Sequence, residues 1–333
     1  MKFLNDIADL DPNLINQLLM LAKRLQNHPE PDALKGKILA LLFLSPSLRT
    51  MTSFQSGMAR LGGNSFMVSP DMAIHNLELE DGVVMDGNKA EHIREALPVI
   101  ASYADILGVR AFAKQESLAD DLDDVFFNNI YKLIDKPLIN MESAIQHPCQ
   151  SLADWKTLDE LDIPKKGGKF VLSWAYHPKA LPLAVPSSTL KMATKRGMDV
   201  TLLCPEEYIL PDAIMQVAHQ LASQNGGNLS ISHDQKSCMN DADIIYAKSW
   251  VSPIYYGRNS EEGAIRAKYK NWCVNDEWFD TNSTCKFMHC LPVRRNVVVS
   301  DSVLNSERSI VLKQANNRLW AQMAVLYHML LGV

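Results

Sequence analysis

The stretch Lys37–Leu44 reads KILALLFL, an apolar run with one charged residue at its start. A short continuous run of this kind is typical of a strand in a parallel sheet that is covered on both faces. It ends in SPSLRT, Ser45–Thr50, and a helical stretch that includes Ser53–Leu61 follows. Strand, polar turn and helix in this order predict a doubly wound α/β fold.

The same unit recurs outward from this stretch. Further strands are expected at Asn64–Val68, Asp105–Arg110, Pro137–Met141, Phe170–Trp174, Asp199–Cys204, Asn228–Ser232, Asp243–Ala247 and Phe287–Leu291. Helices are expected after Asp11-Pro12, at Glu91–Tyr103, from near Ser187 and Pro211, and at Ser309–Leu331. The polar stretch Asp159–Lys169 separates the two sets of strands.

This pattern predicts two doubly wound parallel-sheet, Rossmann-like domains, residues 1–150 and 151–309, each of ordinary domain size. A final helix at about 310–333 is expected to pack back on the first domain and link the two. Ligands of such sheets bind at the carboxyl ends of the strands. We therefore expect a site in the cleft between the domains.

Composition and motifs narrow the classes of function. The 333 residues contain 33 basic and 38 acidic side chains, which disfavours a nucleic-acid binder driven by bulk charge. No apolar run is long enough to cross a membrane, and the N-terminus does not resemble a signal peptide, so a cytoplasmic protein is expected. The six cysteines form no CxxC pair, which disfavours a zinc ribbon and a disulfide framework. GxGxxG and GxxxxGK[ST] are absent.

Polar residues follow the strands of the first domain. Ser47 is a good helix N-cap, and Arg49 and Thr50 add donors beside a helix start, which suits an anion. A capped helix with a surface arginine would give the same local pattern. Arg110 closes the next strand, where it is either an ion-paired core edge or an anion ligand. Further on, Glu142, His147 and Gln150 follow the last strand, and the latter two could polarise a carbonyl oxygen.

The second domain repeats the arrangement. Its strands are followed by His177, by Lys248, and by Cys290 with Arg294. Each has a structural alternative, as a helix cap, a solvated edge or a core thiol. Together, six such sites after six strands predict a cleft with several cations and few carboxylates, which suits ligands that carry phosphate and carboxylate groups.

Three ordered motifs, SPSLRT, HPCQ at 147–150 and HCLPVRR at 289–295, resemble the aspartate/ornithine carbamoyltransferase family. The resemblance covers nearly the whole chain. Met85-Asp86-Gly87 with Glu91-His92, the Trp174/His177 segment and Tyr246–Trp250 resemble the branch that acts on N-acylated ornithine. The acidic DxxxSMG motif of ordinary ornithine enzymes is absent, as fits an α-nitrogen that carries no charge.

The resemblance implies carbamoyl transfer from carbamoyl phosphate to an amine, with no cofactor, no metal and no covalent intermediate. It implies that carbamoyl phosphate is bound by Ser47, Leu48, Arg49, Thr50, His75, Arg110, His147, Gln150 and Arg318. It implies that the acyl-ornithine is bound by Ala90, Glu142, His177, Lys248, Cys290, Leu291 and Arg294. The catalytic residues would be Arg110, His147, Gln150 and Cys290. A homotrimer with shared active sites, and no nucleic-acid or membrane partner, completes the expectation.

Four positions depart from the family pattern. Met51 replaces an arginine, and His75 replaces the tryptophan of the acylornithine branch. Ala90 stands where acetyl-specific enzymes carry glutamate and succinyl-specific ones proline, and Val298 stands where the acetyl enzymes carry lysine. A glutamate would repel a succinyl carboxylate, so Ala90 favours N-succinyl-L-ornithine over N-acetyl-L-ornithine. The alternatives are a plain ornithine, putrescine or aspartate enzyme, a nicotinamide oxidoreductase, and a non-catalytic homologue.

Overall fold

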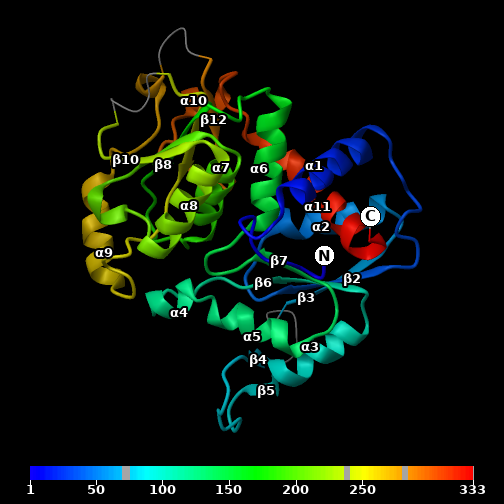
Figure 1. The fold of residues 1–333 in the computed structure, drawn as a ribbon. Coiled ribbons are helices and arrows are strands. Elements are labelled where there is room, and N and C mark those ends of the chain that lie inside the picture. Colours follow the sequence, from blue (N-terminus) through cyan, green and yellow to red (C-terminus); the bar gives the residue numbers. More distant parts are fainter. Residues whose placement is uncertain (70–75, 236–240, 280–283, 333) are drawn as a thin grey trace.

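Two five-stranded, wholly parallel sheets form the framework of the computed structural model, which describes residues 1–69, 76–235, 241–279 and 284–332 (Figure 1). The first sheet has the order β1-β7-β6-β2-β3. Its strands are β1 (Phe3–Leu4), β2 (Ile38–Phe43), β3 (Asn64–Val68), β6 (Ile106–Arg110) and β7 (Leu138–Glu142). The second sheet has the order β10-β9-β8-β11-β12. Its strands are β8 (Lys169–Trp174), β9 (Asp199–Leu203), β10 (Asn228–Ser232), β11 (Ile244–Lys248) and β12 (Lys286–Met288). The predicted fold class is confirmed.

Helices cover and connect the sheets. They are α1 (Pro12–Asn27), α2 (Leu48–Arg60), α3 (Ile93–Ser102), α4 (Leu118–Leu122), α5 (Val125–Leu133), α6 (Pro148–Glu160), α7 (Ala184–Lys195), α8 (Asp212–Asn225), α9 (Asn259–Arg266), α10 (Asp301–Asn305) and α11 (Val311–Leu331). Short 3-10 turns lie at Glu206–Tyr208, Ala267–Tyr269 and Asp276–Trp278.

Helix α6 is the central connector. Its residues Pro148–Leu158 are all buried, and it packs against α7 of the second sheet and against α11. Figure 1 shows α6 (green) between the two halves of the molecule. The C-terminal helix α11 packs against α1, α2 and α6, so the chain's end returns to the N-terminal half.

The strand orders fix where a ligand can enter. In the first sheet β2 pairs with β3 on one side and with β6 on the other. In the second sheet β8 pairs with β9 on one side and β11 on the other. Each sheet therefore has a topological switch point, where a crevice opens at the carboxyl ends of the strands.

Some elements differ from expectation. The expected strand Phe287–Leu291 ends already at Met288, because the following backbone turns to other partners: the His289 N–H donates to the Gln314 side chain at 3.0 Å. Leu291 also has a left-handed φ of 56°, which no ladder residue adopts. The helix expected from Glu91 begins at Ile93, with His92 as its N-cap. Helices α4 and α5, strand β1 and the paired strands β4 (Asn76–Glu78) and β5 (Lys89–His92) were not predicted.

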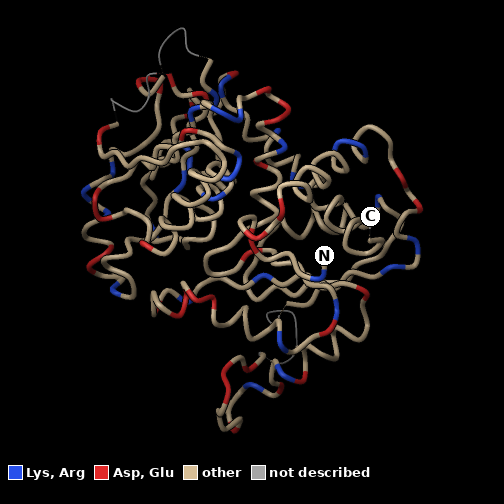
Figure 2. The backbone as a smooth tube through the Cα atoms, viewed as in Figure 1, with Lys and Arg blue, Asp and Glu red and all other residues tan. Residues whose placement is uncertain are grey.

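Charge and hydropathy agree with the sequence analysis. Basic and acidic residues are interspersed along the chain in Figure 2, with no wholly basic half. Within the described ranges, no helix is both long enough and apolar enough to span a bilayer. The five cysteines in those ranges are free thiols; Cys238 lies outside them.

Candidate active site

A cavity of about 410 Å³ lies where the two switch points face each other. Residues at or directly after the ends of six strands line it, together with one residue from α11. The six strands are β2, β6, β7, β8, β11 and β12. The lining includes Ser47, Leu48, Arg49, Arg110, Glu142, His147, Gln150, His177, Lys248, Cys290, Leu291 and Arg318. Twelve of the sixteen residues assigned to the site on sequence grounds therefore meet in one space.

The first wall of the cavity is the N-terminus of α2. Ser47 is the N-cap: its Oγ accepts from the Thr50 N–H at 3.3 Å and donates to Thr50 Oγ1 at 3.0 Å. Arg318, from α11, donates to the same Thr50 oxygen at 2.8 Å. Because a helix start presents free N–H groups and the positive end of the dipole, this wall is suited to an anion. Thr50 itself is fully buried and positions Arg318 from behind the wall.

Arg110 and Glu142 meet at the ends of neighbouring strands β6 and β7. Their side chains form a buried ion pair, and the Arg110 guanidinium also stacks on the Phe112 ring, 4.5 Å from its centroid. Glu142 Oε2 lies 3.4 Å from His147 Nε2. Glu142 thus faces the cavity with its carboxylate held by Arg110, so its first role in this structure is to orient that arginine.

His147 is a neutral imidazole. Burial, with the nearby charges of Arg318 and Arg110, holds its pKa well below the ordinary value for histidine. Its backbone N–H donates to Ser188 Oγ of α7 at 2.7 Å, which fixes the start of α6. Its Nδ1 has no partner among the described residues. A neutral ring with one N–H can donate a hydrogen bond to a carbonyl oxygen without adding a charge.

Gln150 differs from the donor expected from its sequence position. Its amide Nε2 donates to Asp154 Oδ1 at 2.8 Å, one helical turn further along α6. The buried Oε1 is the atom left without a partner in the described part of the chain. Because the Asp154 carboxylate only accepts hydrogen bonds, it must be the Gln150 nitrogen that faces it. The Gln150 oxygen is therefore left to accept a hydrogen bond from a ligand.

The opposite wall comes from the second sheet. Lys248 is the last residue of β11, and Cys290 and Leu291 follow β12. Lys248 is half-buried, and its Nζ pairs with no carboxylate of the described residues. Burial raises the pKa of the Cys290 thiol, with Lys248 acting in the opposite direction. Cys290 is therefore a neutral thiol at neutral pH.

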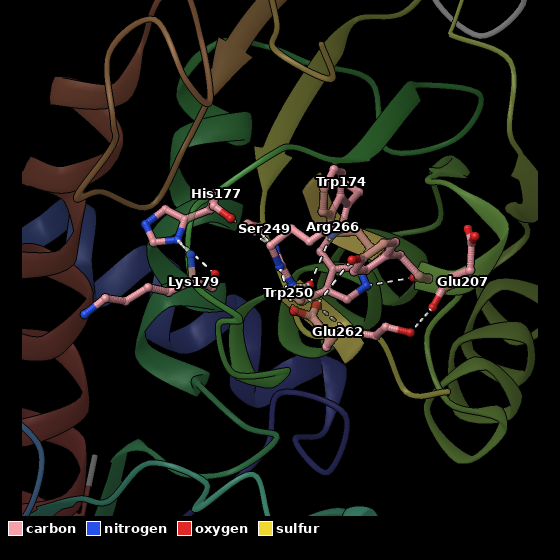
Figure 3. A network of polar contacts seen from close by, with 10 residues as sticks. Trp174, His177, Lys179, Glu207, Ser249, Trp250, Glu262 and Arg266 are labelled. Atoms are coloured by element: carbon pink, nitrogen blue, oxygen red, sulfur yellow. Dashed lines mark hydrogen bonds and ion pairs between the residues drawn. The ribbon is translucent and has the colours of Figure 1, made fainter. Parts of the chain in front are cut away.

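His177 joins this wall to an arginine network (Figure 3). Arg294 Nε donates to His177 Nε2 at 3.0 Å, so that nitrogen is unprotonated and Nδ1–H faces the Lys179 carbonyl oxygen at 2.9 Å. Burial lowers the pKa of His177, as suits this neutral form. Arg294 is exposed and lies just outside the cavity lining.

Arg266 anchors the backbone behind His177 and Lys248. It is 2% exposed and forms a bidentate pair with Glu262. It also donates to Ser249 Oγ and to the Trp250 carbonyl oxygen, both at 2.8 Å. Figure 3 shows the guanidinium between Ser249, Trp250 and Glu262. The residue directly after Lys248 is thus held by a buried charge, which fixes where the β11 strand ends.

The net electrostatics of the cavity are cationic. Its described lining contains four cations, Arg49, Arg110, Lys248 and Arg318, against the single carboxylate Glu142. The Nε atoms of Arg49, Arg110 and Arg318 are buried without a partner inside the described chain. Buried donors that lack acceptors are costly unless a ligand supplies them. The cavity therefore suits an anion on the α2 side and a carboxylate on the Lys248 side.

Besides Thr50 and Arg294, one described residue of the predicted set, Ala90, does not line the cavity. Ala90 is exposed in β5, on the arm that projects from the first half at the bottom of Figure 1, so it lies outside the site of its own chain. His75 falls outside the described residues. Val298, which bears on the acyl group, is buried with its carbonyl oxygen accepting from the Val274 N–H at 3.0 Å.

Other residues of the site were missed. Phe112 follows β6 by two residues, so the strand-end rule could have found it. Asp154, Gln314 and Arg266 act one layer behind the lining. Asp154 carried a usable signal, because it lies four residues after Gln150 and so shares its helix face. Gln314 and Arg266 carried none.

Comparison with known proteins agrees with this geometry. The family model of the carbamoyl-P binding domain of aspartate/ornithine carbamoyltransferases matches residues 2–160. The model of the Asp/Orn binding domain matches residues 184–329.

Individual relatives match over nearly the full length. An N-acetylornithine carbamoyltransferase from Xanthomonas campestris pv. campestris is 41% identical over 96% of this chain and 93% of its own. An N-succinylornithine carbamoyltransferase from Bacteroides thetaiotaomicron is 38% identical, over 90% and 89%. A crystal structure of acetylornithine transcarbamylase complexed with acetylcitrulline superposes with a TM-score of 0.94 at 38% identity, covering 99% of both chains. The chain therefore belongs to the aspartate/ornithine carbamoyltransferase family, and it is a carbamoyltransferase.

Proposed function

We propose that the protein transfers the carbamoyl group of carbamoyl phosphate to the δ-amine of N-succinyl-L-ornithine. The products are N-succinyl-L-citrulline and phosphate, and the step belongs to arginine biosynthesis. The observation that carries the proposal is the cavity itself, in which cations converge from both switch points around one carboxylate. N-acetyl-L-ornithine is the alternative acceptor.

The phosphate group is assigned to the α2 N-terminus, with Arg49, Arg110 and Arg318 as its charged ligands. Their unpartnered buried Nε atoms support this assignment. The carbonyl oxygen of the carbamoyl group takes the N–H of neutral His147, and the carbamoyl N–H faces the Oε1 acceptor of Gln150. In this pose, donors stand ready where negative charge develops on the carbonyl and on the departing phosphate.

The acceptor is assigned to the other wall. Its carboxylates are matched to Lys248 and Arg294, and its δ-amine to the Cys290 sulfur and the Leu291 carbonyl oxygen. The amine nitrogen attacks the carbonyl carbon, the bond from that carbon to the phosphate oxygen breaks, and the phosphate accepts the proton that the amine loses. Holding the two reactants together supplies much of the acceleration. If Cys290→Ala left turnover unchanged at every pH, Cys290 would have no part in this step.

The domain assignment follows the same division. We assign carbamoyl phosphate binding to residues 1–150 with the C-terminal helix from about 310, and acyl-ornithine binding to residues 151–309. The packing of α11 on α1 and α2, and its supply of Arg318, support grouping that helix with the first domain.

Charge favours the succinyl acceptor. N-succinylornithine has two carboxylates, and Lys248 and Arg294 each lack a carboxylate partner within the described residues. A solved N-acetyl-L-ornithine transcarbamylase variant, in which alanine replaces a glutamate, is complexed with carbamyl phosphate and N-succinyl-L-norvaline. The higher identity to the Xanthomonas acetyl enzyme favours the alternative.

Because Ala90 lies on a projecting arm, its effect on the acyl group requires a neighbouring copy. We therefore propose a homotrimer with shared sites. Light scattering that gave a monomer mass for fully active protein would contradict the homotrimer.

A citrulline-formation assay tests the function. Purified protein and carbamoyl phosphate are mixed in parallel with N-succinyl-ornithine, N-acetyl-ornithine and free ornithine. Turnover of the succinyl compound alone is expected. Preference for the acetyl compound would move the proposal to the alternative, and activity with free ornithine only, or with none, would overturn it.

The variant Ala90→Glu, with Ala90→Gln as its uncharged control, isolates the charge effect. Glutamate is expected to lower succinyl turnover at least tenfold relative to glutamine, because a desolvated like charge faces the succinyl carboxylate. Equal turnover by both variants would show that residue 90 does not select the acyl group by charge.

A further inference from the structure

One buried carboxylate lies behind both walls of the cavity. Asp154 of α6 is fully buried, and its Oδ1 accepts two hydrogen bonds, from Gln150 Nε2 and from Gln314 Nε2, each at 2.8 Å. Gln150 belongs to the same helix and lines the cavity. Gln314 belongs to α11 and is also fully buried. Two amides from two helices thus share a single acceptor atom.

This arrangement fixes which way each amide faces. An acceptor oxygen requires an N–H opposite it, so both glutamines turn their nitrogen toward Asp154 and their oxygen away. Gln314 Oε1 then accepts from the His289 backbone N–H at 3.0 Å. Gln150 Oε1 stays without a partner in the described residues. The reverse orientation of either amide would place two oxygens against each other.

The two freed oxygens act on opposite sides of the site. Gln150 Oε1 is an acceptor at the carbamoyl end. Gln314 Oε1 holds the backbone at His289, directly before Cys290, at the acceptor end. His289 Nδ1 in turn accepts a hydrogen bond from the Leu291 N–H at 2.9 Å. These successive hydrogen bonds therefore fix the turn that follows β12.

We propose that Asp154 is a positioning residue: by orienting two glutamine amides at once, it presents an acceptor to the carbamoyl N–H and fixes the Cys290 turn. The proposal rests on the proposed function, since it assumes that carbamoyl phosphate occupies the cavity. Asp154 touches neither substrate.

The protonation state of Asp154 leaves this arrangement intact. Burial raises its pKa to about 7, against the hydrogen bonds from the two glutamines and the nearby Tyr246 and Arg318; Cys290 also faces it. Both glutamine N–H groups point at Oδ1, so a proton on this carboxyl is carried by Oδ2, on the side of Tyr246, and Oδ1 remains an acceptor in both states.

The test compares the binding of carbamoyl phosphate with that of acetyl phosphate. Carbamoyl phosphate and acetyl phosphate share the phosphate and the carbonyl, and acetyl phosphate has a methyl group in place of the NH₂. Calorimetry on the full-length protein is expected to show a preference of roughly tenfold for carbamoyl phosphate, the size of one hydrogen bond to an otherwise unpaired buried acceptor. Failure of the wild-type protein to bind either phosphate would count against the proposed function and not against the role of Asp154.

Two variants then separate positioning from packing. Asp154→Leu removes the acceptor and keeps the branching of the side chain, and the preference is expected to fall to about onefold with acetyl phosphate affinity little changed. Asp154→Asn keeps an acceptor oxygen and is expected to retain most of the preference. The proposal would be overturned if Asp154→Leu weakened the binding of carbamoyl phosphate and acetyl phosphate equally, or if it left the preference between them unchanged.

Gln314→Leu tests the second effect of Asp154, on the Cys290 turn. It also provides a test of the proposal if the Asp154→Leu protein does not fold. Loss of the acceptor for the His289 N–H is expected to raise the KM for the acyl-ornithine several-fold, while the preference between the two phosphates stays that of the wild type. An unchanged KM in folded Gln314→Leu protein would refute the link between Asp154 and the Cys290 turn.

Discussion

The two walls of the cavity are built differently. On the α2 side, Arg110 and Arg318 are buried, and each is held by a partner on another secondary-structure element. On the opposite side, Lys248 is half-buried with no carboxylate partner in the described residues, and Arg294 is exposed and held by one bond to His177. The first wall is preformed, whereas the second is fixed at its backbone and free at its side-chain ends.

The two walls are therefore sensitive to different substitutions. A preformed charged wall stabilises a transition state without reorganising, but it depends on charge balance in the protein itself. A wall of free cations can adjust to its ligand, and its precision depends on the layer behind it, chiefly Arg266 and Asp154.

Breaking the first wall should have the largest effect. Arg110→Met removes a ligand of the developing charge, and kcat/KM is expected to fall about 10³-fold. It also leaves Glu142 buried without its partner, which is expected to lower the free energy of unfolding by about 3–5 kcal/mol. Steady-state kinetics and urea unfolding measure the two effects. The double variant with Glu142→Gln should recover stability without activity; recovery of both would contradict the role of Arg110.

Arg266→Met breaks the layer behind the second wall. Loss of this buried partner of Glu262 is expected to lower the free energy of unfolding by about 3–5 kcal/mol. The KM for the acyl-ornithine should rise while carbamoyl phosphate affinity stays unchanged, because Arg266 supports the Lys248 side. Arg258→Met, which removes the exposed pair with Glu261, is the control and should change stability by at most about 1 kcal/mol. If Arg266→Met weakened the binding of both substrates equally, Arg266 would not act on the Lys248 side alone.

Lys248→Met tests the free end of the second wall. We expect the KM for the acyl-ornithine to rise roughly 10- to 100-fold, the range for a lost hydrogen bond to a charged group. Thermal unfolding should be nearly unchanged, since no carboxylate of the described structure depends on this lysine. A large loss of stability with intact KM would reverse the comparison between the walls.

The raised pKa of Asp154 predicts that the stability of the folded protein depends on pH. Its pKa is raised from 3.8 to about 7 in the folded protein, so between these values the folded state binds the proton more tightly than the unfolded state. The stability from this group is therefore present at low pH and is lost as pH rises toward 7. Relative to wild type, Asp154→Asn should gain about 2–3 kcal/mol between pH 5 and pH 8, measured by urea unfolding. A constant difference across this range would contradict the raised pKa.

Much of the fold could be predicted because its signals are local. The strands Asn64–Val68 and Asn228–Ser232 have the predicted bounds, and six of the other seven predicted strands differ by one residue at one end or at both ends. Apolar runs mark parallel strands because both faces of those sheets are covered. The arm of β4 and β5 gave no such signal, because its residues Lys89, Ala90 and Glu91 are exposed and have no apolar periodicity.

The site was predictable for a related reason. Strand ends of a parallel sheet meet at one edge, so residues after strands, such as Arg49, Arg110 and Lys248, could be grouped without a structure. The orientation of Gln150 could not be predicted in this way. Its amide direction depends on Asp154 and, through it, on Gln314 of α11, which lies 160 residues further along the chain.

The strand and helix pattern, the cationic character of the cleft and the family of the chain all follow from the amino-acid sequence. These depend on side-chain type and on spacing along the chain. Three contacts follow only from the three-dimensional packing: Glu142 holds Arg110, Arg266 anchors the Lys248 strand end, and Asp154 orients two glutamines. Each of these pairs charges or hydrogen-bonding groups from different elements, and such pairing depends on packing distances of about 3 Å that no local pattern encodes.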